Sequence, residues 1–200
     1  MIYAFLVLAS FIQLSFAEVK LKNGDILLQP LNCSACDLIE AEESTIFSHV
    51  GVVIQTRPDV LVAEAYGNVR ATRLEDFLKK SQKGQRVLIA RLKNLKAVDS
   101  IQNDSFTNFF FKNFNNLKYD DEFLWNNVDD QGREKLYCSE LVSKLYFESL
   151  RIEIPVKRMH FFKNRQMWFK YFNGKIPDGE WGNSPGDIER SSLFYHLGEL

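Results

Sequence analysis

The segment S-H-V-G-V-V-I at residues 48–54 decides how the middle of this chain folds. Its apolar, β-branched residues are typical of a strand, and alternation places His49, Gly51 and Val53 on one face of it. A histidine in an apolar strand, beside a glycine that leaves space, is suited to act as a base in a cleft. The alternative is a core histidine whose ring is satisfied by a backbone carbonyl.

Further strand and helix patterns surround this segment. Strands are predicted at residues 25–29, 60–66, 69–72 and 86–92, with Gly67-Asn68 as a hairpin turn, and helices at residues 73–80, 98–114 and 138–150. Residues 30–44 and 120–134 are interpreted as loops, and residues after 155 follow no clear pattern. Since the strands are grouped in the middle and the helices come mostly later, we expect an α+β fold.

Glu64 interrupts the apolar strand at residues 60–66. A carboxylate at such a position is costly unless it is paired or exposed. If residues 55–59 close a hairpin with Glu64 opposite His49 or Gly51, the glutamate and the histidine share a face, whereas a slip of one residue separates them. The alternative is a glutamate that faces solvent.

Cys138 stands at the start of the helix predicted over residues 138–150. Unpaired N–H groups and the positive end of the helix dipole favour a thiolate there, and the same amides can hold an oxyanion. The alternative is a small buried cysteine on the apolar face of the helix. The other two histidines, His160 and His196, lie in aromatic segments and are interpreted as structural.

Cys33 and Cys36 form a C-x-x-C pair. A local disulfide that staples a loop is the first interpretation, ahead of two structural thiols and of a redox site, which is expected to open a helix. A zinc site is disfavoured because no second pair of ligands follows at a suitable spacing.

The amino terminus predicts export. Residues 1–17 carry no charged side chain and end in S-F-A, which suits a signal peptidase, and the apolar run is too short to span a bilayer. We therefore expect a signal peptide at 1–17, one domain at 18–200, and a periplasmic or extracellular protein; an uncleaved anchor is the alternative. The 25 basic and 26 acidic residues nearly cancel, which argues against a nucleic-acid partner.

Taken together, these motifs resemble the YiiX-like branch of the NlpC-type papain-like cysteine peptidases. The similar segments are G-D-I-L (24–27), S-H-V-G-V-V (48–53), E-A (64–65), Y-D (119–120) with Phe123, Y-C-S-E-L-V (137–142), and P-G-D-I (185–188) with Ser191. The resemblance covers nearly the whole chain after residue 17, although residues 33–36 and 99–116 match none of the family's motifs. It implies a circularly permuted papain-like fold, in which helices pack on a central antiparallel sheet and the nucleophile lies at a helix N-terminus.

The resemblance also implies roles for particular residues. Cys138 aligns with the nucleophile, His49 with its base, Glu64 with the residue that orients the histidine, and Tyr119 with a tyrosine that helps to stabilise the oxyanion. Neither a metal nor an organic cofactor is implied.

The activity implied is that of an exported cysteine hydrolase that cleaves a cell-wall peptide or N-acyl amino acid amide through a thioester. Two alternatives remain. A lipid acyl hydrolase or acyltransferase would have a wide apolar groove beside Cys138, and a catalytically inactive domain would bind a ligand only. The expected partner is a small amide, peptide or lipid substrate close to a membrane or cell wall.

Overall fold

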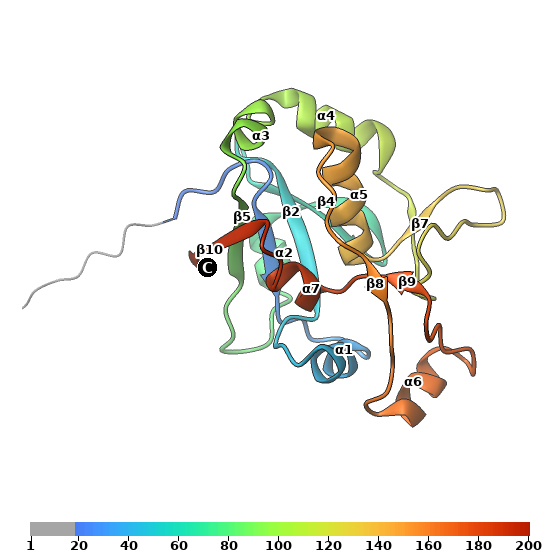
Figure 1. The fold of residues 1–200 in the computed structure, drawn as a ribbon. Coiled ribbons are helices and arrows are strands. Elements are labelled where there is room, and N and C mark those ends of the chain that lie inside the picture. The colour runs from blue at the N-terminus through green and yellow to red at the C-terminus, as the bar shows by residue number, and fades with distance from the viewer. Residues whose placement is uncertain (1–18) are drawn as a thin grey trace, which may run out of the picture.

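An eight-stranded sheet runs through the middle of the computed structural model, which describes residues 19–200 (Figure 1). The predicted signal peptide at residues 1–17 lies outside the described residues. The spatial order is β10-β5-β1-β2-β3-β4-β6-β7, and all neighbours pair antiparallel except β6 and β7, which are parallel. The strands are β1 (Ile26–Gln29), β2 (His49–Gln55), β3 (Leu61–Tyr66), β4 (Asn68–Arg73), β5 (Leu88–Leu92), β6 (Lys118–Tyr119), β7 (Lys135–Leu136) and β10 (Phe194–Glu199).

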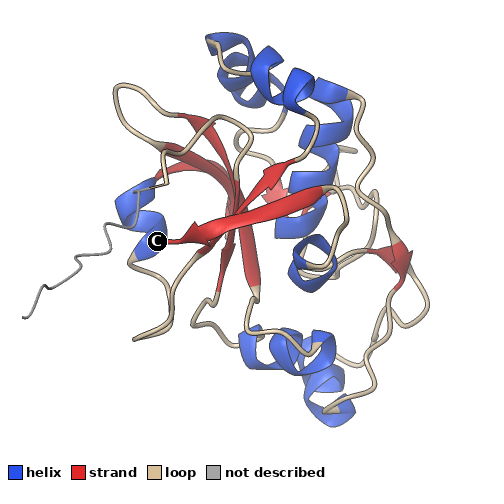
Figure 2. Ribbon diagram, turned by 60° about the vertical axis from the view of Figure 1, so that its left-hand side comes forward, coloured by secondary structure: helices blue, strands red, loops and turns tan. Residues whose placement is uncertain are grey.

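Helices cover both faces of this sheet (Figure 2). They are α1 (Cys36–Glu43), α2 (Leu74–Leu78), α3 (Leu95–Ser100), α4 (Asp104–Asn113), α5 (Cys138–Leu150), α6 (Arg165–Tyr171) and α7 (Pro185–Glu189). The residues of β2 that alternate toward one face, such as Val50 and Val52, pack with α4 and α5 in the largest buried cluster. Val53, on the opposite face, packs with Phe77 of α2. Period-2 alternation thus separates two cores across one strand.

The α+β class and the central antiparallel sheet are confirmed. The strands predicted around residues 25–29, 48–54, 60–66, 69–72 and 86–92 are present, and the helix predicted over residues 138–150 is α5 with the same bounds. No helix within residues 19–200 is both long enough and apolar enough to cross a bilayer.

Two predictions about helices were wrong. Residues 98–114 form two helices rather than one, because the Asn103 side chain accepts a hydrogen bond from the Ser105 N–H at 3.0 Å and so begins α4 as a new helix. Residues 30–44 are not entirely loop, since they contain α1, whose Leu38 is buried against aromatic residues from the far end of the chain. Such a distant packing partner is invisible to local patterns.

The cysteine pair forms the local disulfide, Cys33–Cys36, and Cys138 is free. One argument used against a redox site does not hold, however, because Cys36 is the first residue of α1. The C-x-x-C motif therefore does open a helix.

The region left unassigned after residue 155 builds a small unit beside the sheet. A two-stranded sheet of β8 (Lys157–Arg158) and β9 (Trp181–Gly182) holds the ends of a segment that carries α6 away from the main sheet (Figure 1). Its buried side is aromatic and packs with Leu38 of α1. The members of this cluster are Leu38, Phe123, Tyr137, Met159, Phe161, Trp168 and Phe172.

Candidate active site

His49 and Glu64 meet on one face of the sheet because of the register between β2 and β3. Gly51 pairs with Glu64, so His49, two residues away on the same face, is the diagonal neighbour of the glutamate. The His49 Nε2 atom lies 3.0 Å from Glu64 Oε2, and both side chains are buried. Of the two pairings considered from the sequence, Glu64 opposite His49 or opposite Gly51, the structure has the second.

Gly51 permits the close approach of the two strands. A Cβ atom at this position would lie 2.6 Å from Val62 Cγ1 and 3.0 Å from both the Ala63 carbonyl oxygen and Phe77 Cε2. These neighbours belong to a strand and to a packed aromatic ring, so they have little freedom to move aside. The glycine therefore makes room for β3 and α2 around the histidine.

Glu64 is surrounded by donors that the sequence analysis missed. The Lys80 ammonium donates to both carboxylate oxygens at 2.5 and 2.7 Å, and the Thr72 hydroxyl donates to Oε1 at 2.5 Å. Arg70, which pairs with Glu64 across β3 and β4, brings its Nε atom to 3.5 Å. Arg70 and Thr72 were predictable from the hairpin register, whereas Lys80 follows α2 and gave no local signal.

These contacts keep the Glu64 carboxylate ionised. Burial by itself raises the pKa of Glu64, but the hydrogen bond and charge of His49, together with the hydrogen bonds from Lys80 and Thr72, outweigh it and lower the pKa to about 2. The glutamate is thus a fixed negative charge that can orient the imidazole and support its protonated form.

Cys138 is the second partner of His49. It is the first residue of α5, is buried, and lines a cavity together with His49. Burial works to lower the pKa of His49, but hydrogen bonds to Cys138 and Glu64 and the negative charges of both partners outweigh it and raise the pKa to about 9. The imidazole therefore has the Glu64 carboxylate and the Cys138 sulfur as partners, and its raised pKa favours the protonated form at neutral pH.

Tyr119 reaches the same cavity through the edge of the sheet. The parallel pairing of β6 with β7 sets Tyr119 beside Leu136, two residues before Cys138. Burial, followed by the charge on Cys138, raises the pKa of the Tyr119 hydroxyl well above its usual value. The tyrosine therefore keeps its proton and can donate it in a hydrogen bond. Three of the four residues singled out from the sequence, His49, Tyr119 and Cys138, line this cavity, and Glu64 contacts His49 from behind.

The cavity has a volume of about 430 Å³ and two unlike walls. The polar wall is formed by His49 and Cys138, and Glu64 supports the histidine from behind. The aromatic wall faces the cavity with Phe123, Tyr137, Met159, Phe161, Trp168 and Tyr171. The Cys33 end of the disulfide lies at the cavity as well, so the stapled turn before α1 forms part of its rim.

The other two histidines lie outside the polar wall. His160 lines the cavity but is exposed, stacks on Phe162, and contacts Asp178 through Nδ1 at 3.3 Å. His196 contacts the Glu189 carbonyl through Nε2 at 3.0 Å. Only the first of them is placed to touch a molecule in the cavity, which the sequence analysis did not predict.

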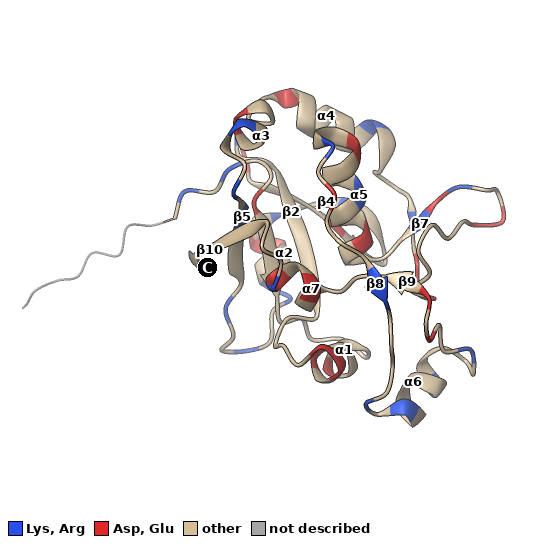
Figure 3. Ribbon diagram, in the orientation of Figure 1, with Lys and Arg blue, Asp and Glu red and all other residues tan. Residues whose placement is uncertain are grey.

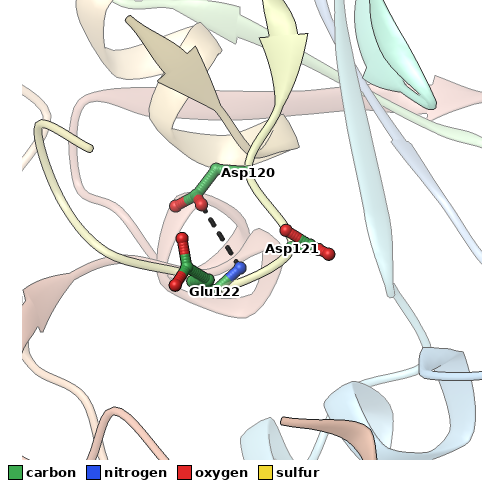
Figure 4. Close-up of side chains that lie close together, drawn as sticks. All are labelled: Asp120, Asp121 and Glu122. Atoms are coloured by element: carbon green, nitrogen blue, oxygen red, sulfur yellow. Dashed lines mark hydrogen bonds between the residues drawn. The ribbon is translucent and has the colours of Figure 1, made fainter. Parts of the chain in front are cut away.

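Asp120, Asp121 and Glu122 gather near the site, with one oxygen of each within 4.8 Å of the others (Figure 4). Asp120 accepts hydrogen bonds from the Glu122 and Leu124 N–H groups, and Glu122 pairs with Lys135 at 2.7 Å. The chain's own donors thus already engage two of the three carboxylates, those of Asp120 and Glu122, which leaves them poorly suited to hold a resident metal ion.

Comparisons with known proteins give the same fold. The chain is 28% identical to the uncharacterized protein YiiX of Escherichia coli (strain K12) over 133 residues, which are 66% of this chain and 61% of that protein, less than two thirds of its length. It superimposes on the crystal structure of metalloprotein YiiX from Escherichia coli O157:H7 with a TM-score of 0.73 and 21% identity, covering 90% of this chain and 97% of that one.

The family comparison covers most of the chain. Residues 20–177 match the model of the permuted papain-like amidase enzymes, the YaeF/YiiX or C92 family. This match includes His49, Glu64, Tyr119 and Cys138 and confirms the resemblance stated from the motifs, although P-G-D-I at 185–188 lies beyond it. The chain therefore belongs to the permuted papain-like amidase family that contains YaeF and YiiX.

Proposed function

We propose that this protein is an exported cysteine hydrolase that cleaves an amide through a thioester on Cys138. The observation that carries the proposal is the position of His49, which is buried against the Glu64 carboxylate and lines one cavity together with the Cys138 sulfur. A nucleophile, its base and a group that orients the base are the three parts that acyl transfer by this route requires.

The reaction begins from a thiolate and an imidazolium. The sulfur of Cys138 attacks the carbonyl carbon, the C–N bond breaks, and His49 gives its proton to the leaving amine. His49 then takes a proton from water, whose oxygen attacks the thioester and releases the acid and the free sulfur. Glu64 keeps its charge throughout, because Lys80 and Thr72 hold it in the ionised form.

The oxyanion of the tetrahedral intermediate needs donors on the cavity side of the sulfur. The backbone N–H of Cys138 belongs to the first turn of α5, where amides have no partner within the helix. The protonated Tyr119 hydroxyl is the second donor. One such donor is typically worth about 3 kcal/mol of transition-state stabilisation.

The aromatic wall supports a substrate with an apolar acyl group. Of the two amide substrates considered, cell-wall peptides and N-acyl amino acids, the aromatic wall favours the N-acyl amino acids. Peptides rich in polar groups gain little binding energy from contact with aromatic rings. The same wall favours a second candidate, a lipid acyl hydrolase or acyltransferase, for which a wide apolar groove beside Cys138 was predicted.

Export is supported by two features. The predicted signal peptide at residues 1–17 and the Cys33–Cys36 disulfide both suit a compartment that oxidises thiols.

One structural neighbour is described as a metalloprotein. In this chain the nearby carboxylates of Asp120 and Glu122 are engaged by the chain's own donors. The proposed reaction uses no metal ion.

An activity-based acyl probe tests the proposal. We expect the probe to label Cys138 and the protein to release free acid from N-acyl amino acids faster than from muropeptides or acyl lipids. Cys138→Ala should abolish turnover while leaving the fold intact. Turnover that persists in this variant would refute the thioester route.

Iodoacetamide labelling across a pH range separates the enzyme from an inactive binding domain. An activated Cys138 reacts well below neutral pH, whereas an ordinary thiol reacts only as the pH approaches about 8.5. The second pattern, together with ligand binding and no product, would favour the binding domain.

A further inference from the structure

The segment at residues 156–181, which runs from β8 through α6 to β9, exposes an unusual amount of apolar surface. Five of the eleven exposed large hydrophobic side chains of the described residues lie within it. They are Val156 (37% exposed), Phe162 (65%), Met167 (53%), Phe169 (57%) and Trp181 (46%). Single exposed apolar residues are ordinary, but a concentration of this kind marks an interaction surface.

The same segment is strongly basic although the whole chain has a net charge of −1. It contains six basic residues, Lys157, Arg158, Lys163, Arg165, Lys170 and Lys175, against two acidic ones, Asp178 and Glu180. Figure 3 shows this concentration as blue on β8, on α6 and on the loops that flank the helix. The local charge is therefore +4, from six minus two.

Much of this charge is not neutralised by the protein itself. Arg165 contacts Asp178 at 3.1 Å, and Lys157 pairs with Glu43 and Asp187 outside the segment. Lys170 and Lys175, in contrast, have no carboxylate within 4 Å among the described residues. The Arg158 guanidinium lies 4.3 Å above the exposed Trp181 ring, so charge and aromatic surface are interleaved.

The side chains that anchor α6 to the rest of the protein differ from those that it exposes. Trp168 and Phe172 of the α6 region point inward and pack with Phe161 in the aromatic cluster. Met167 and Phe169, which alternate with them, are more than half exposed. The fold therefore anchors the segment by one side of α6 and leaves the other side available.

We propose that the segment at residues 156–181 docks the protein onto an anionic lipid surface. Anionic lipid headgroups would supply the negatively charged partners that Lys170 and Lys175 lack within the protein. Their acyl boundary accepts side chains such as Phe162, while lysine stems extend along the apolar layer. Trp181 is of the type that prefers the membrane interface. Nucleic acid fits less well, because the basic residues are set among aliphatic and aromatic side chains rather than along a continuous basic face.

Docking by this segment would also bring the cavity close to the bilayer. Phe161, Trp168 and Tyr171 belong to the same segment and form part of the aromatic wall on its inner side. An amphiphile that leaves the surface would therefore travel only across the thickness of the segment to reach Cys138. The docking itself does not depend on the proposed chemistry.

Co-sedimentation of the purified protein with vesicles tests the proposal. We expect binding to vesicles of phosphatidylglycerol mixed with phosphatidylcholine, weak binding to phosphatidylcholine alone, and a steep loss with added salt. The double variant Lys170→Glu/Lys175→Glu should lower the partition coefficient about tenfold or more, because each basic residue near the surface contributes to the attraction. Phe162→Ser/Phe169→Ser should lower it comparably while leaving turnover of a soluble substrate unchanged.

Phe111→Ser on α4 is the matched control, since Phe111 is 45% exposed and lies outside the segment. Its binding should equal that of the unmodified protein. The proposal fails if anionic vesicles do not retain the protein, if the segment variants bind as well as the control, or if the control loses binding equally. Retention by isolated anionic cell-wall polymer but not by vesicles would also overturn it, in favour of a wall ligand.

Discussion

The two walls of the cavity are built by different means. In the polar wall and behind it, each group has a fixed partner: Glu64 is buried among four donors, and His49 has Glu64 and Cys138 as partners. The aromatic wall is held mainly by ring packing, as in the pair Phe161 and Trp168 at 5.0 Å between centroids, with a few hydrogen bonds such as that from Trp168 Nε1 to Glu42 at 3.3 Å. Hydrogen bonds impose direction and charge, whereas ring packing imposes mainly volume. The rate of the chemical step should therefore be sensitive to small changes in the polar wall. Substrate preference should respond to larger changes in the aromatic wall.

Among changes that keep Cys138, removing the charge of Glu64 should have the largest effect on turnover. Glu64→Gln leaves the shape intact, but the amide favours the wrong imidazole tautomer and no longer supports its positive charge. We expect kcat to fall about 10³- to 10⁴-fold, as when the equivalent charge is removed from a serine protease triad. Steady-state kinetics with an N-acyl amino acid as substrate measures this fall in kcat. A loss below about tenfold would mean that Glu64 serves stability alone.

The pH dependence of stability should show the same coupling. The pKa of His49 is raised from 6.5 to about 9. The contribution of this shift to the free energy of unfolding is therefore complete below pH 6.5 and is lost as the pH rises through 9. Urea unfolding should therefore show a decline of a few kcal/mol between pH 6 and pH 10. The decline should shrink in His49→Asn. An equal decline in that variant would assign it to other groups.

Two glycines allow the walls to be compared directly. Gly51→Ala forces a Cβ atom against strand backbone and a packed ring and should cost about 1–3 kcal/mol of unfolding free energy. Gly182→Ala, beside the aromatic wall, meets the Met159 side chain at 3.0 Å and the Tyr137 hydroxyl at 2.8 Å. Methionine adapts readily, so we expect a smaller cost in thermal unfolding. Equal costs would show that both walls are equally rigid.

The aromatic wall should tolerate change with a loss of affinity only. Tyr171→Leu shortens the wall at a half-buried position, and we expect KM for an apolar N-acyl substrate to rise about three- to tenfold with kcat nearly unchanged. An N-acetyl analogue, which does not reach the wall, is the control and should be unaffected. A fall in kcat for both substrates would place Tyr171 in the chemical step.

Local patterns predicted the sheet well and the aromatic unit poorly. The strand at residues 48–54, the Gly67-Asn68 hairpin and the helix that begins at Cys138 each follow a short period or a turn that the adjacent residues specify. In contrast, α1 and α6 are short helices without a side-chain cap. Their buried residues, Leu38 of α1 and Trp168 of α6, belong to the same aromatic cluster. Their stability comes from tertiary contacts, which a window along the chain does not contain.

By itself, the sequence determined that His49 and Glu64 share a strand face if the hairpin register is right, and that Cys138 begins a helix. Only the tertiary structure decided that register, placed Lys80 against Glu64, and brought Cys138 to His49. The physical reason is that periodicity specifies directions within one element. Distances between elements depend on how their buried faces fit together across the whole core.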